Sequence, residues 1–221
     1  MDKQEILQAI QNLRKDSKKR NFSQTFDLQF KLQQLDLKKQ ENKVEAFAIM
    51  PHPRGKNVKV CALVGGALHN DAKDNCDRAI IEDDFKQIAS NKKEVKKLVR
   101  EYDFFIAQAD KMPSVATSFG RFLGPLGKMP NPKAGGIIPP KGSTKVIHDR
   151  LQKTVKLSVK AELGVKCPIG KEDMGDELVA DNALAVYHAL VNALPQHENN
   201  IKSSWIKFSM SKPVKIGGSK K

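Results

Sequence analysis

The stretch MPHPRGKNVKVCALVGG, residues Met50 to Gly66, decides the fold because it joins two kinds of sequence. Its first part contains two prolines and a glycine that interrupt the preceding pattern, so we interpret 51–56 as a linker. The following run, Val58 to Val64, is almost wholly apolar and ends at two glycines. Such a run is typical of a strand buried on both faces of a parallel sheet. The chain therefore changes character within these residues.

The segments on either side of this region differ from it in hydrophobic pattern. Apolar and polar residues alternate over 22–32 and 44–50, and again from Thr154 and over 204–210, which predicts half-buried strands. Helical spacing of apolar residues predicts an N-terminal helix over 3–16, and we expect another helix over 174–193. The two ends of the chain thus resemble each other.

The middle of the chain predicts a different layer structure. Apolar runs at 58–64 and 103–107 flank a helix-rich segment, 82–100, and a further helix is expected over 143–151. We predict an α/β protein of two domains: a discontinuous α+β domain of residues 1–55 and 152–221, and an inserted Rossmann-like α/β domain of residues 57–150. Two crossings between them would form a double-linker hinge.

Charge and composition limit the possible partners. Lys and Arg number 39 against 25 Asp and Glu, a net charge of +14 at pH 7, which favours nucleic acid or an anionic membrane surface. The sequence contains no apolar run near the ~20 residues that a membrane span requires, and its first residues are polar, so we expect no membrane partner and no signal peptide. The 3 cysteines lie far apart, which predicts reduced thiols in a cytosolic protein.

We expect neither a metal, nor a cofactor, nor enzymatic activity. The five histidines form no metal-ligand spacing with one another or with cysteine. Adjacent acids at 82–84 stand where a helix begins and are better explained by the helix dipole than by catalysis. One alternative remains, a cytosolic enzyme that binds a phosphorylated ligand with the central domain. However, Gly65-Gly66-Ala67 lacks the third glycine and the spacing of a dinucleotide-binding turn.

A second informative stretch is GRFLGPLGKMPNPKAGG, residues Gly120 to Gly136. Its glycines and cations predict a loop that offers backbone N–H groups and positive charge to a polyanion. It is not a nucleotide-binding P-loop, because Phe122 stands where that motif needs glycine and Met129 follows the lysine. The stretch is similar to the signature of the large-subunit ribosomal protein one family. The matching residues are Gly120, Arg121, Leu123, Gly124, Pro125, Gly127, Pro130 and Pro132.

Other segments extend this resemblance over nearly the whole chain. Residues 20–26, RNFSQTF, resemble the family's entry into its first strand, and Met50-Pro51-His52 with Gly55-Lys56 resembles its interdomain hinge. The segments 91–93 and 103–110 resemble the archaeal branch rather than the bacterial one. The hinge residues that this comparison implies are Pro51, His52 and Gly55.

The resemblance implies a function and a set of contacts. Members of the family hold the ribosomal RNA (rRNA) stalk of the large subunit beside the exiting tRNA, assist release of deacylated tRNA, and in some cases repress their own mRNA. We accordingly expect a cytoplasmic ribosomal protein that is a monomer off the ribosome. The candidate rRNA-binding residues are Lys19, Arg20, Phe22, Ser23, Thr25, Lys166, Lys171, Lys207, Ser209, Met210 and Ser211. Secondary RNA contacts are expected at Arg121, Gly124, Gly127 and Lys128.

The triplet Ser209-Met210-Ser211 stands where the family has Thr-Met-Gly. Serine at 209 retains the hydroxyl, whereas serine at 211 adds a Cβ where the family has none. If Ser211 takes the backbone conformation of a glycine, we expect its φ to be positive. We therefore predict that Ser211→Gly binds rRNA as well as the native chain or better.

Overall fold

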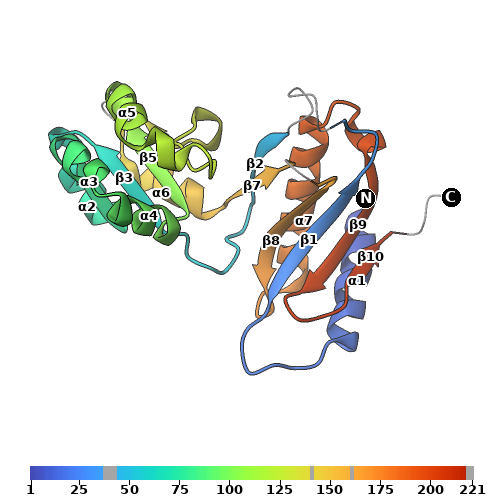
Figure 1. Ribbon diagram of the computed structural model, residues 1–221. Helices are drawn as coiled ribbons and strands as arrows, with labels where there is room; N and C mark the ends of the chain where they lie inside the picture. Colours follow the sequence, from blue (N-terminus) through green and yellow to red (C-terminus); the bar gives the residue numbers. More distant parts are fainter. Residues whose placement is uncertain (37–43, 140–141, 160–161, 218–221) are drawn as a thin grey trace. The chain divides into compact units, whose positions relative to one another are not determined.

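A computed structural model describes residues 1–36, 44–139, 142–159 and 162–217 of the chain (Figure 1). The chain divides into two compact units. Unit 1 consists of residues 1–56 and 153–221, and unit 2 consists of residues 57–152. None of the helices in the described ranges has both the length and the apolar composition needed to cross a membrane.

Unit 1 is an antiparallel sheet with helices on one face. The sheet has the strand order β10-β9-β1-β8, and β2 and β7 form a separate antiparallel pair. The strands are β1 (Thr25–Leu32), β2 (Glu45–Ile49), β7 (Thr154–Ser158), β8 (Gly164–Lys171), β9 (Ile201–Phe208) and β10 (Val214–Ile216). The helices α1 (Lys3–Asp16) and α7 (Asp176–Ala193) pack against the sheet and each other.

The core of unit 1 follows from the alternation in β1. Phe26, Leu28, Phe30 and Leu32 all point to the helices and are at most 2% exposed. Burial of each such side chain stabilises the unit by roughly 1.5–3 kcal/mol. The rings of Phe26 and Phe208 lie 4.4 Å apart between centroids, which fixes the start of β1 beside the end of β9. The opposite face of the sheet has mostly polar and charged side chains, with Trp205 and Pro168 among them.

Two strand boundaries differ from the predicted ones. The strand expected from Phe22 begins at Thr25, so residues 22–24 precede the sheet. The last predicted strand ends at Phe208, and Ser209, Met210 and Ser211 belong to a turn that leads into β10. This turn closes through the Ser211 N–H, which donates to the Phe208 carbonyl oxygen at 3.3 Å. The prediction missed β10 because three residues carry too little periodicity.

Unit 2 is a four-stranded parallel sheet with helices on both faces. Its strand order is β4-β3-β5-β6. The strands are β3 (Val60–Val64), β4 (Arg78–Ile81), β5 (Phe104–Gln108) and β6 (Ile137–Ile138), and the helices are α2 (His69–Asn75), α3 (Phe85–Ser90), α4 (Lys92–Glu101), α5 (Met112–Leu123) and α6 (Thr144–Gln152).

Two separate apolar clusters flank the parallel sheet. One involves α3, α4 and α5, and the other involves α2 and α6. All five residues of β3 are buried, as expected for a strand covered on both sides. The predicted α/β architecture with a parallel sheet in the middle of the chain is therefore confirmed. The short strands β4 and β6 were not predicted.

Candidate nucleic-acid interface

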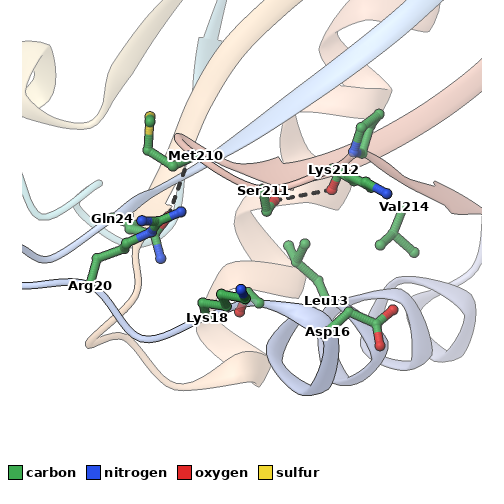
Figure 2. A pocket seen from close by; sticks show the side chains of 11 residues that line it. Leu13, Asp16, Lys18, Arg20, Gln24, Met210, Ser211, Lys212 and Val214 are labelled. Atoms are coloured by element: carbon green, nitrogen blue, oxygen red, sulfur yellow. Dashed lines mark hydrogen bonds between the residues drawn. The ribbon is translucent and has the colours of Figure 1, made fainter.

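The entry into β1 and the turn after β9 form one surface at the end of the unit 1 sheet. The Thr25 N–H donates to Ser209 Oγ at 3.2 Å. The Met210 N–H donates to Gln24 Oε1 at 3.4 Å, the contact drawn in Figure 2. We call residues 19–25 and 209–212 the strand-end surface. Segments almost two hundred residues apart in sequence thus contribute to one site.

Two large apolar side chains of this surface face solvent. Phe22 is 53% exposed and Met210 is 62% exposed, so neither belongs to the core. Lys19, Arg20 and Lys212 are exposed beside them, and the charged ends of their side chains form no hydrogen bond or ion pair with the described residues. Exposed apolar groups among cations are the combination that binds single-stranded or distorted RNA, through stacking and phosphate contacts.

The turn residue Ser211 does not adopt the expected conformation. Among the described residues other than glycine, only Gln34 and His197 have a positive φ. The expectation for Ser211 was therefore wrong, and its hydroxyl supplies the reason. Ser211 Oγ accepts the Phe208 N–H at 2.8 Å and donates to the Lys212 carbonyl oxygen at 3.0 Å, so the side chain itself closes the turn.

Three further lysines lie on the sheet face opposite the helices. In the register of β8 and β1, Lys166 lies opposite Gln29 and Lys171 lies opposite Thr25. Lys207 lies beside Asp27 on the neighbouring strand. Burial raises the pKa of the Asp27 carboxyl, and the Lys207 charge offsets part of that rise. This face therefore extends the positive charge of the strand-end surface.

One buried polar residue that the sequence did not reveal, Gln24, helps to hold the surface in place. Gln24 is only 1% exposed, and besides accepting from Met210 its backbone exchanges hydrogen bonds with Glu172 at 2.8 and 3.2 Å. Ser23 Oγ donates to the Asp173 carboxylate. A glutamine before a strand gives no pattern that distinguishes it from a solvent-facing residue, so sequence reasoning could not find this role.

The predicted hinge residues are attached to unit 1. The His52 N–H donates to Oδ1 of the buried Asn182 at 3.0 Å, and Asn182 Nδ2 donates to the Ile169 carbonyl oxygen at 2.8 Å. Gly55 has a φ of +76°, and a Cβ there would lie 3.2 Å from the side chain of Lys171. Pro51, which precedes His52, is exposed. The linker is therefore fixed to unit 1 at His52 and packs against it again at Gly55.

In the stretch Gly120 to Gly136 of unit 2, two backbone N–H groups donate hydrogen bonds within the stretch itself. Its first four residues belong to α5, not to a loop. The N–H of Gly124 donates to the Gly120 carbonyl oxygen and that of Gly127 to the Gly124 carbonyl oxygen, each at 2.9 Å. Gly127 has a φ of +61°, which glycine adopts without strain. These two N–H groups are therefore not free for a phosphate, contrary to expectation.

The lysine of the same stretch is also engaged. Lys128 Nζ donates to the carbonyl oxygens of Val99 and Tyr102, both at 2.7 Å, where α4 ends. Burial lowers the pKa of this lysine. Cations are favoured at a helix C-terminus because the last carbonyl groups lack partners. Arg121, by contrast, is exposed, and its guanidinium forms no hydrogen bond or ion pair with the described part of the chain.

The crevice at the carboxyl ends of β3 and β5 is where an open α/β sheet would bind a phosphorylated ligand. There the Gly65 N–H donates to Gln108 Oε1 at 3.0 Å. Lys111 Nζ pairs with the Glu82 carboxylate at 2.6 Å, and Ser114 Oγ also donates to it at 2.9 Å. These three donors are thus already paired within the unit and are not free for a phosphate.

No group of three or more His, Cys, Asp or Glu side chains within the described ranges is placed to hold a metal ion. The cysteines are free thiols. Burial raises the pKa of Cys61 and of Cys167 to about 12 and that of Cys76 to about 11. These thiols stay protonated at neutral pH and are poor nucleophiles.

The fold and this surface define a class of protein: a basic two-unit chain in which a parallel α/β unit interrupts an antiparallel α+β unit. The sequence profile of the Ribosomal protein L1p/L10e family matches residues 13–212. The chain belongs to this family.

Curated relatives match over nearly the whole chain. The protein named large ribosomal subunit protein uL1 of Thermococcus kodakarensis is 37% identical over 216 residues, which cover 97% of this chain and 98% of that protein. Its namesake in Nanoarchaeum equitans is 39% identical over 206 residues, covering 91% and 95%, and that of Pyrococcus horikoshii is 35% identical over 219 residues, covering 98% and 97%. These relatives confirm the predicted archaeal type.

Proposed function

We propose that this chain is a structural constituent of the large ribosomal subunit in the cytoplasm and binds the 23S-type rRNA of the stalk through unit 1. The observation that carries the proposal is the strand-end surface, where Phe22 and Met210 are exposed beside cations without acidic partners. The family and the names of the curated relatives support the ribosomal assignment. A family of ribosomal structural proteins also argues against an enzyme.

The residues of this surface offer different kinds of contact to RNA. Phe22 and Met210 offer flat or flexible apolar contact to bases and riboses, whereas Ser209 retains a hydroxyl proton that it can donate to a phosphate or a 2′-OH. Lysines on the adjoining sheet face, Lys166, Lys171 and Lys207, neutralise phosphates along the bound strand. Arg121 adds a secondary contact from unit 2.

The finer roles rest on the family resemblance. We propose that the chain lies beside the exiting tRNA, assists release of deacylated tRNA, and represses translation by binding its own mRNA. Off the ribosome we expect a monomer. We propose that the two units move relative to each other about a bending point after Gly55, because His52 is hydrogen-bonded within unit 1 and Gly55 packs against Lys171 of the same unit.

A salt series tests the proposal. The affinity of the full chain for a transcribed rRNA stalk fragment should fall linearly with salt concentration on a double logarithmic plot, because bound cations release counterions from phosphates. Lys207→Gln should lower the slope by about 1 without changing which RNA is preferred. A flat response to salt would contradict phosphate binding by this surface.

A further inference from the structure

A hollow of about 540 Å³ lies between the last turn of α1 and the turn that joins β9 to β10 (Figure 2). Its volume falls within the roughly 300–1,000 Å³ of small-molecule sites in proteins. It borders the strand-end surface because Met210, Ser211 and Lys212 line both. The hollow continues beyond that surface to residues of α1 and β10, which the proposed rRNA contacts do not use.

The lining of the hollow has apolar walls and a charged rim. Leu13 of α1, only 1% exposed, forms part of its base, and Val214 of β10 lies opposite. Lys18, Arg20 and Lys212 line it, and the charged groups of these three side chains form no hydrogen bond or ion pair with the described residues. Most exposed cations of a protein surface are solvated, but these three surround one concave space.

A carboxylate also borders the hollow, on the α1 side and directed away from Lys18 and Arg20 in Figure 2. Asp16, in the last turn of α1, also lines the hollow and makes no hydrogen bond or ion pair with the described part of the chain. Beside it, the last carbonyl groups of α1 add negative partial charge. A hollow for phosphate alone would not contain this acceptor, because it repels the ligand that the surrounding cations attract.

One ligand matches both signs of charge. A nucleotide has apolar faces, N–H donors along its base edge, and phosphates on either side of its sugar. We propose that the hollow takes up one unstacked nucleotide of the bound RNA, with its base over Leu13 and Val214, its N–H donors on Asp16, and its flanking phosphates on the surrounding cations. This inference rests on the proposed function, since the RNA supplies the nucleotide.

The carboxylate also selects among the bases. Guanine presents two adjacent donors, the ring N1–H and the exocyclic amine, which match the two oxygens of Asp16. Adenine and cytosine present one exocyclic amine each, and uracil presents one ring N–H. A bidentate pair of this kind discriminates by about 1–3 kcal/mol in base recognition. Guanine is therefore the expected occupant.

One substitution tests the inference, because the two possible sites predict opposite changes in RNA affinity. In the full chain, Asp16→Asn should weaken binding of a transcribed rRNA stalk fragment by about tenfold, because the amide cannot accept both donors. If phosphates alone contact the surrounding cations, removing the negative charge of Asp16 strengthens binding instead, and the inference is overturned. Glu177→Gln is the matched control, because Glu177 is an exposed acid of unit 1 outside the hollow, and it should leave affinity unchanged.

Mononucleotides provide a second test that needs no variant. In the RNA-free chain, guanosine 5′-monophosphate should shift the methyl resonances of Leu13 and Val214 more strongly than the adenosine, cytidine and uridine monophosphates do. Inorganic phosphate should leave these methyl resonances in place. Equal responses to all four nucleotides would overturn the guanine preference, and a response to phosphate alone would overturn the placement of a base.

Failure of this inference is distinguishable from failure of the proposed function. If the native chain binds the rRNA fragment with the expected salt dependence but Asp16→Asn strengthens binding, only the nucleotide site is wrong. If the native chain does not bind the fragment at all, both are wrong. Melting curves of Asp16→Asn exclude loss of folding as the cause of weaker binding.

Discussion

Lys128 in unit 2 and Arg20 in unit 1 look alike in the sequence, since each stands in a basic, turn-rich stretch. The structure separates them, because the ammonium of Lys128 is bound to two carbonyl oxygens at 2.7 Å, whereas Arg20 has no partner among the described residues. Lys128 holds a loop of its own unit, whereas the guanidinium of Arg20 is left free at one end of the unit 1 sheet. Positive charge in a motif is thus not the same as positive charge available to a ligand.

Separating the two units should produce the largest change in rRNA affinity. We expect a chain that joins residues 1–55 to 152–221 through a short linker to retain most of the rRNA affinity. The isolated piece 57–150 should bind at least about 100-fold more weakly, as expected when only nonspecific phosphate contacts remain. Affinities measured at one salt concentration decide this, and equal affinities of the two pieces would contradict the assignment of the site to unit 1.

Replacing Lys128 should affect stability rather than binding. Lys128→Met keeps the length of the side chain but removes two charge-assisted hydrogen bonds, so unit 2 should lose about 2 kcal/mol in free energy of unfolding. The control is Lys133→Met, which removes an exposed charge of the same stretch and should leave stability nearly unchanged. If Lys128→Met keeps the native free energy of unfolding but binds rRNA more weakly, this lysine contacts RNA after all.

The turn after β9 allows a finer comparison within unit 1. Met210→Ala should weaken rRNA binding by about fivefold to tenfold, because an exposed apolar contact is lost without a change in folding. Ser211→Gly, which the sequence predicted to be neutral or favourable, should now cost about 1 kcal/mol of stability, since it removes the hydroxyl that accepts the Phe208 N–H. Calorimetry of both variants separates the two effects, and unchanged binding by folded Met210→Ala would exclude this contact.

The smallest expected effect concerns acid stability in unit 2. The Thr144 N–H and hydroxyl donate to the Asp71 carboxylate at 2.9 and 2.8 Å and hold its pKa below the ordinary value of 3.8. Because the folded pKa is the lower one, this contact stabilises the unit above pH 3.8 and is lost as pH falls through the folded value. Asp71→Asn should lower the melting temperature of unit 2 by about 3 °C at neutral pH. The difference should shrink in acid, and a constant difference would contradict this account.

The sequence by itself determined the architecture and the family. The alternation in β1 and the apolar run of β3 are local patterns that follow from burial of one or both faces. The break at residues 51–56 is also local, because it comes from two prolines and a glycine. The signature at Gly120 to Gly136 indicated the family by resemblance, and two of its glycines, Gly127 and Gly135, have the positive φ that glycine adopts without strain. Such features depend on residues that are close together in the sequence, so they can be predicted from a single sequence.

Only the tertiary structure decided which groups remain free to bind. Gln24 supports Met210, and Asn182 holds His52, through hydrogen bonds that span 186 and 130 residues. The engagement of Lys128 by α4 and the hollow beside Asp16 likewise arise from segments far apart in sequence. Hydrogen bonding and charge neutralisation depend on distances of a few ångströms, and residue spacing along the chain does not specify those distances. Availability for a ligand is a property of the folded molecule.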